Sequence, residues 1–287
     1  MNQTQGENKS RHQWVFWLVL IGLLTLRIPF LAGMHFFNIQ QDWADTAFEI
    51  GTYLLTIFLI WWELDHLADY HIDALAVIII IFFKPIQTLI LKDWGFGRPL
   101  EFPSIPSLLI WLIAIVFAMG IWWKRSKLLA IKPINLGWLF IGILAGLAMT
   151  IVLSFPMSFQ ISSDQIVHGL SVKGTLAQIP SAFVYQIGYA AVSEEPLFRG
   201  FLWGYLRKLK WRELWIWLFQ AGLFTFSHIY YINRYPISFW IIVPVGALIL
   251  GWLAWRSRTI ASSMAAHGMI NATGLSFGYL MALYRLG

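Results

Sequence analysis

Two adjacent carboxylates and a guanidinium lie in an otherwise apolar stretch, and these residue types can move protons. Glu194, Glu195 and Arg199 fall within residues 176–201, where each buried charge costs about 2.5–3.5 kcal/mol in a bilayer on insertion scales. Glu195 and Arg199 are four residues apart, so they share a helix face and can pair. Glu194 points about 100° away and has no oppositely charged partner at helical spacing. A helix-locking salt bridge explains the first pair but leaves Glu194 unexplained, and this favours a role in proton transfer.

Two further apolar stretches carry polar side chains that could act with this acid. The stretch at residues 213–229 ends in Phe224-x-x-x-His228, and the stretch at residues 259–284 contains His267 and Asn271. Because His267 and Asn271 are four residues apart on a helix, both side chains project from one face. Together they can direct two donors at one oxygen, which is what a tetrahedral oxyanion requires.

These parts combine into a mechanism for hydrolysing a peptide bond. Glu194 and His228 would hold and deprotonate a water molecule, which then attacks a substrate carbonyl. His267 and Asn271 would stabilise the oxyanion. Glu195 and Arg199 would hold the catalytic side chains in position without contacting the substrate. An activated water needs no Ser or Cys nucleophile, and the chain contains no cysteine.

The elements that must position these residues are predicted to be membrane-spanning helices. The 287 residues are 59% hydrophobic and only 12% charged, whereas soluble domains carry about 25% charged residues. We therefore predict an all-α, polytopic integral membrane protein with an intramembrane active site. About nine apolar segments are long enough to cross the bilayer, or eight if one merges or re-enters; they are 14–31, 46–62, 73–91, 107–123, 136–155, 176–201, 213–229, 239–255 and 259–284.

The orientation of these segments follows from the basic residues between them. Lys and Arg cluster at 124–132, 207–212 and 256–258, and all three clusters fall in the cytoplasm if the N-terminus is cytoplasmic. The first segment, preceded by Lys9 and Arg11, is predicted to be an uncleaved anchor. The net charge of +6 is scattered at the ends of the apolar segments, which fits membrane orientation and not nucleic-acid binding. The expected partners are therefore the lipid bilayer and a membrane-associated protein or peptide. In a bacterium the location would be the cell inner membrane.

The chain is predicted to form one membrane domain with two parts. Residues 1–155 carry N-terminal helices without a chemical motif, and residues 156–287 carry the catalytic core, with its motifs within 194–271. Gly142 and Gly146 form a small-xxx-small pair that predicts close helix packing.

The three motifs resemble those of the CAAX protease and bacteriocin-processing family of intramembrane endopeptidases, which includes the Rce1-like type II CAAX endopeptidases. The family's Glu-Glu-x-x-x-Arg, Phe-x-x-x-His and His-x-x-x-Asn motifs are matched, in this order, over roughly residues 180–275. The resemblance implies an α-helical membrane protease whose first Glu and second-motif His activate water. It implies that the third-motif His and Asn form the oxyanion site, which agrees with the roles argued from the residues: Glu194, His228, His267 and Asn271.

Alternatives to a metal-independent endopeptidase stay open. Glu194, His228 and His267 could instead form a three-ligand zinc site; we expect no cofactor, because Asn271 beside His267 suits an oxyanion better than a metal shell. A proton-coupled transporter could use the buried acids and histidines together with Lys84. A non-catalytic membrane scaffold or immunity protein could retain the same motifs. The acidic loop at residues 63–73, with His66, Asp69 and Asp73, is most simply a solvated loop but could bind a metal.

Overall fold

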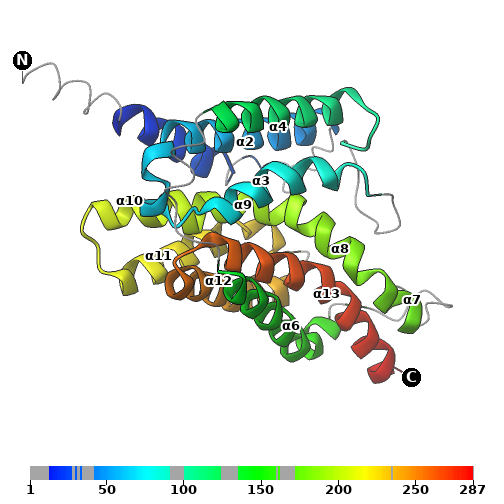
Figure 1. The fold of residues 1–287 in the computed structure, drawn as a ribbon. Coiled ribbons are helices and arrows are strands. Elements are labelled where there is room, and N and C mark those ends of the chain that lie inside the picture. Colours follow the sequence, from blue (N-terminus) through cyan, green and yellow to red (C-terminus); the bar gives the residue numbers. More distant parts are fainter. Residues whose placement is uncertain are drawn as a thin grey trace, which may run out of the picture.

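The structure is a computed structural model that describes residues 13–27, 30, 33, 42–90, 100–123, 135–159, 161, 172–233 and 235–286. Within these residues all regular secondary structure is helical (Figure 1), as the apolar segments predict. The basic cluster at 124–132 lies outside the described residues.

Among the described residues, the N-terminal half contains a first helix, four labelled helices and one short 3₁₀ helix. The first helix, of 15 residues, is Gln13–Arg27. The labelled elements are α2 (Asp42–Trp62), the 3₁₀ helix η1 (Leu64–Tyr70), α3 (Ala74–Gln87), α4 (Ile105–Trp123) and α6 (Leu136–Ser158).

The C-terminal half contains the elements that carry the three motifs. They are α7 (Val172–Ala177), α8 (Ile179–Gln186), the π-helix η3 (Ile187–Ala191), α9 (Val192–Glu195), the π-helix η4 (Pro196–Leu202), α10 (Trp203–Lys208), α11 (Glu213–Phe226), the 3₁₀ helix η5 (Ile229–Tyr231), the π-helix η6 (Ser238–Ile242), α12 (Val243–Ser257) and α13 (Ile260–Leu286).

Several helices have the length and composition of membrane spans. In the described part of the chain, four helices qualify; they are Trp43–Trp62, Ile105–Trp123, Leu136–Ser158 and Ser238–Ser257. The pair Leu64–Tyr70 and Ala74–Gln87, bent by 103°, adds a fifth if it is one span. The expected eight or nine spans stay a prediction, because the segment that carries Glu194 is broken into short helices and α13, although 27 residues long, is not among the helices that qualify.

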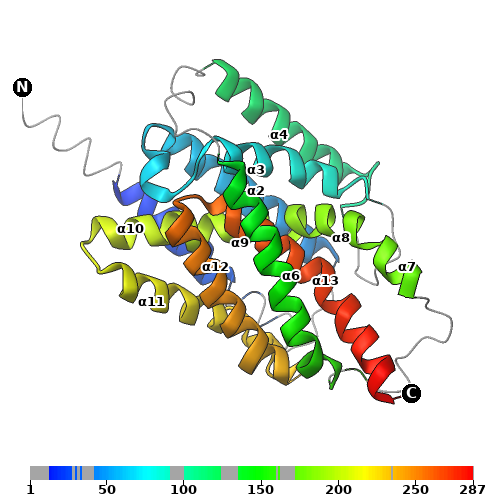
Figure 2. The same ribbon diagram turned by 60° about the horizontal axis from the view of Figure 1, so that its bottom comes forward.

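Helix α13 lies beside α6 in both views and also contacts α8 and α12 (Figures 1 and 2). Two glycines of α6 allow this close approach: a Cβ on Gly142 would lie 2.2 Å from the carbonyl oxygen of Ser262, and one on Gly146 would lie 2.5 Å from that of Ala266. The predicted close helix packing at the small-xxx-small pair is therefore confirmed, and the partner helix is α13.

The segment that carries Glu194 and Glu195 departs from a regular α-helix. A single α turn, Val192–Glu195, is placed between the π-helical stretches Ile187–Ala191 and Pro196–Leu202. Pro196 follows directly, and a proline lacks the backbone donor that a regular helix needs at this point. The helical run extends to Lys208, beyond the predicted end at residue 201. Isolated π turns often occur at functional sites, because they redirect side chains without ending the helix.

Candidate active site

Glu195 connects two of the predicted functional residues. Its Oε1 atom accepts a hydrogen bond from Arg199 Nη1 at 3.1 Å and lies 2.8 Å from His267 Nδ1. Glu195 and Arg199 are fully buried, and His267 is nearly so. The predicted pairing of Glu195 with Arg199 is thus present. The structure adds that the same carboxylate holds the His267 ring, which directs Nε2 away from Glu195; carboxylates that orient histidines in this way are common behind reactive sites.

The Phe224 ring contacts the side chains of Arg199, His228 and His267. The Arg199 guanidinium lies 4.1 Å from the Phe224 ring centroid, which is a cation–π geometry. The ring centroids of His228 and His267 lie 4.6 Å and 6.1 Å from the same ring. The Phe224 ring thereby brings the second and third motifs next to the first.

Glu194, which has no oppositely charged partner at helical spacing, has one from a distant part of the chain. Its Oε1 atom forms an ion pair with Arg27 Nη2, from a residue 167 positions earlier in the chain. Its Oε2 atom is buried, has no hydrogen-bond partner among the described residues, and lies 3.8 Å from His267 Nε2. The carboxylate is therefore anchored at one oxygen and open at the other.

A backbone carbonyl in the last turn of α11 selects one tautomer of the His228 ring. Residue 228 directly follows Ser227, the C-terminal cap of α11, and its Nδ1 lies 2.9 Å from the Phe224 carbonyl oxygen. A carbonyl only accepts, so Nδ1 carries the proton and Nε2 of the neutral ring is an acceptor. His228 is buried, and no direct hydrogen bond joins it to Glu194 among the described residues.

Asn271 is held by Gln186, a residue outside the three motifs that was not predicted to take part. Its Nδ2 atom donates to Gln186 Oε1 at 3.3 Å, and the side chain is half-buried one turn after His267 on α13. Gln186 ends α8, eight residues before Glu194. A glutamine inside an apolar helix was a signal of the same kind as the acids, and so was Arg27 within the first apolar segment at 14–31.

No site for a metal ion is formed by the side chains of the described residues, since no group of three or more His, Cys, Asp or Glu is arranged to hold one. The three residues considered as zinc ligands do not fit that role here: Glu194 already pairs with the Arg27 guanidinium, whose positive charge would repel a divalent cation. The expected absence of a cofactor stays a prediction.

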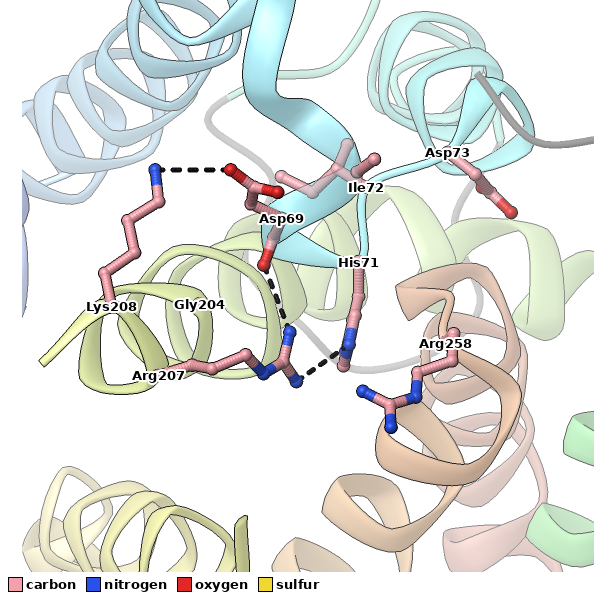
Figure 3. Close-up of a pocket in the computed structure, with 9 residues that line it drawn as sticks. Asp69, His71, Ile72, Asp73, Gly204, Arg207, Lys208 and Arg258 are labelled. Carbon is pink, nitrogen blue, oxygen red and sulfur yellow. Dashed lines mark hydrogen bonds and ion pairs between the residues drawn. The ribbon is translucent and has the colours of Figure 1, made fainter. Parts of the chain in front are cut away.

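A cavity of about 400 Å³ lies apart from these residues, where η1, α10 and the α12–α13 turn meet (Figure 3). Arg207 contacts the Asp69 carbonyl and His71, and Lys208 lies 3.7 Å from Asp69 Oδ2. Asp73 caps α3 by accepting from the Ala76 amide at 2.8 Å. The expected solvated loop at residues 63–73 is therefore wrong: most of it forms the 3₁₀ helix η1, Glu63 and His71 are buried, and the segment connects helices. The described residues give it no metal site.

Lys84, the buried cation that a proton-coupled transporter could use, also has a structural partner. Its Nζ atom is fully buried and lies 2.9 Å from Glu49 Oε2 of α2. The pair joins α2 to α3 and contains neither of the motif carboxylates.

The segment that carries the three motifs matches a known protein family. Residues 176–273 match a family model described as type II CAAX prenyl endopeptidase Rce1-like. The matched range covers about a third of the chain and includes all three motifs, so the resemblance read from the motifs is confirmed. No curated protein and no solved structure matches the chain.

Proposed function

We propose, from the premise that residues 176–273 form an Rce1-like segment, that this chain is an integral membrane endopeptidase. In this proposal Glu194 and His228 activate a water molecule within the membrane, and His267 with Asn271 stabilises the oxyanion. The substrate is a membrane-associated or lipidated protein or peptide. The residues before 156 form further helices of the same membrane domain.

One observation carries the proposal: Glu194 Oε2 is a buried carboxylate oxygen without a hydrogen-bond partner among the described residues, 3.8 Å from His267 Nε2. A buried acceptor without a partner is costly, and one bridging water satisfies both atoms at this separation. Glu194 Oε2 and His267 Nε2 thus flank a position suited to a water molecule, and the proposal assigns His228 and Asn271 to the same position.

The reaction follows from the roles of these atoms. Glu194 takes a proton from the water as its oxygen bonds to the substrate carbonyl carbon. The negative charge that develops on the carbonyl oxygen is met by donors from His267 and Asn271. The C–N bond then breaks, and Glu194 returns its proton to the leaving amine.

The orientation of His267 has a consequence for its charge in this step. Its Nδ1 proton is directed at Glu195, so Nε2 donates to the oxyanion only when the ring is doubly protonated. The Glu195 carboxylate, 2.8 Å from Nδ1, stabilises that imidazolium, and Arg199 holds the carboxylate in place.

The test is cleavage of prenylated and non-prenylated membrane peptides by the purified protein, with Glu194→Gln beside the wild type. We expect Glu194→Gln to lose activity by about 100-fold or more, the contribution typical of a general base. Glu101→Gln, a glutamate outside the motifs, should cleave at the wild-type rate. A chelator should leave the rate unchanged if no metal takes part, and inhibition that zinc reverses would support a zinc-dependent protease.

The same variant distinguishes a protease from a transporter and from a scaffold. A Glu194→Gln protein that inserts normally and cleaves as fast as the wild type would overturn the protease proposal. Proton flux through liposomes, lost in the same variant, would favour a transporter. If neither activity depends on Glu194, a non-catalytic scaffold is the better account.

A further inference from the structure

Arg27 reaches the proposed general base from outside the motif region. It ends the helix Gln13–Arg27, and its Nη2 atom pairs with Glu194 Oε1. Both side chains are only 7% exposed. The residue lies far from the family match at 176–273, so neither the three motifs nor that match assigns it a function.

We infer that Arg27 is a positioning residue that holds Glu194 by one carboxylate oxygen and leaves the other directed at the water. This inference rests on the proposed function, because it gives Arg27 a role only through Glu194. It also makes the N-terminal helix part of the catalytic unit.

The contacts on the two carboxylate oxygens support this division. Oε1 is occupied by the guanidinium, whereas Oε2 has no hydrogen-bond partner among the described residues and lies 3.8 Å from His267 Nε2. Without an anchor, a carboxylate rotates about its terminal side-chain bond, since that torsion is broad. A fixed Oε1 therefore fixes where Oε2 can accept a proton.

An arginine suits this role for a chemical reason. Its guanidinium stays charged under all ordinary conditions and carries only donors, so it anchors a carboxylate without exchanging protons with it. Glu194 can then gain and lose the proton of the attacking water while its position is maintained. A lysine supplies the charge but lacks the planar fork.

A second ion pair, between a buried lysine and a partly buried glutamate, contains no motif residue. Lys84 and Glu49 join α2 to α3 at 2.9 Å. No histidine is paired with Glu49 among the described residues. This makes Lys84→Gln a control, because it also removes the cation of an ion pair, but one that contains neither of the motif carboxylates.

The experiment compares Arg27→Gln, Arg27→Lys and Lys84→Gln in detergent, with kcat and KM measured on one cleaved peptide and thermal stability measured in parallel. We expect Arg27→Gln to lower kcat about 10–100-fold, the effect typical of residues that orient a reactive group. KM should stay within about twofold, because Arg27 contacts the base and not the substrate. Arg27→Lys should recover several-fold of the lost kcat.

The control variant separates a positioning role from a purely structural one. Lys84→Gln is expected to lower stability while the folded protein keeps the wild-type kcat. If Arg27→Gln behaves in the same way, or if its kcat rises, Arg27 does not position the base and the inference is wrong. Should Arg27→Gln not fold, Arg27→Lys decides alone, since a positioning role predicts a reduced kcat in a folded protein.

Failure of this inference and failure of the proposed function can be told apart by Glu194→Gln. An inactive Glu194→Gln protein beside a fully active Arg27→Gln protein contradicts only the role of Arg27. An active Glu194→Gln protein contradicts both.

Discussion

At the scale of single residues, the site depends on side chains that serve two neighbours at once. Glu195 Oε1 accepts from Arg199 and also faces His267 Nδ1. Phe224 supports the same arginine and both histidines. Removing one such residue therefore disturbs more than one contact, and stability and activity should change together.

The first prediction concerns Glu195→Gln. The substitution leaves the fully buried Arg199 without its paired charge, which we expect to cost about 3–5 kcal/mol of unfolding free energy. It also removes the carboxylate that orients His267, so kcat should fall about 10–100-fold. Denaturant unfolding in detergent and peptide cleavage measure the two effects. Unchanged stability would show that the ion pair is not formed in the folded protein.

The second prediction concerns Gln186, which accepts from Asn271 Nδ2 at 3.3 Å. Gln186→Leu removes the acceptor that orients this amide, and one neutral hydrogen bond is worth about 1 kcal/mol. We therefore expect a roughly fivefold fall in kcat. Gln186→Glu keeps an acceptor at this position and should stay closer to the wild-type rate. Equal rates for both variants would argue against a positioning role for Gln186.

At the scale of the elements, the position of α13 decides where two of the four proposed catalytic residues lie. The helix is set by its contact with α6, where Gly146 faces Ala266, the residue before His267. The other side of the site is set by the single α turn Val192–Glu195 between two π-helical stretches. A small shift of α13 would therefore change the distance between His267 and Glu194.

The third prediction tests this dependence with Gly146→Ala. The new Cβ would lie 2.5 Å from the Ala266 carbonyl oxygen and 2.9 Å from Met269 Cβ, so α13 has to move. We expect a lower thermal stability and a lower cleavage rate, even though alanine favours a helix by about 1 kcal/mol over glycine. Gly51→Ala is the control, because nothing lies within 4 Å of its added Cβ. It should be neutral or slightly stabilising, and a stabilised Gly146→Ala protein would contradict the proposed packing.

At the scale of the whole molecule, segments predicted to lie on the same side of the membrane are close together in the fold. Counting the predicted spans from a cytoplasmic N-terminus places the segments 63–73, 207–212 and 256–258 on the cytoplasmic side. Residues from each of them line the cavity in Figure 3, with Asp69, Arg207 and Arg258 among them. Residues of these three segments lie together, which agrees with their placement on one side of the membrane, and the orientation itself stays a prediction.

The fourth prediction is that orientation itself. The chain has no cysteine, so single cysteines can be introduced without a background. Arg212→Cys should react with a membrane-impermeant maleimide only after the cells are permeabilised, and Lys173→Cys should react in intact cells. A reporter fused after Gly287 distinguishes the two span counts, because nine spans place it outside and eight place it inside. The reverse labelling pattern would overturn the cytoplasmic N-terminus.

Much of the site could be predicted from the sequence because helical geometry is local. Charges and amides in apolar segments identified Glu194, Glu195, Arg199, His267 and Asn271, and the spacing of four residues paired Glu195 with Arg199. Gly142 and Gly146 predicted a close helix contact in the same way. The same charges, set in segments too apolar for a soluble fold, indicated the class of protein.

What only the tertiary structure decided are the contacts between segments far apart in the chain. The sequence left Glu194 without a charged partner, whereas the folded chain supplies Arg27 from 167 residues away. It likewise places His267 against Glu195, and Gln186 against Asn271. The physical reason is that the period of a helix fixes which residues share a face, whereas the approach of two faces depends on how all the helices pack together.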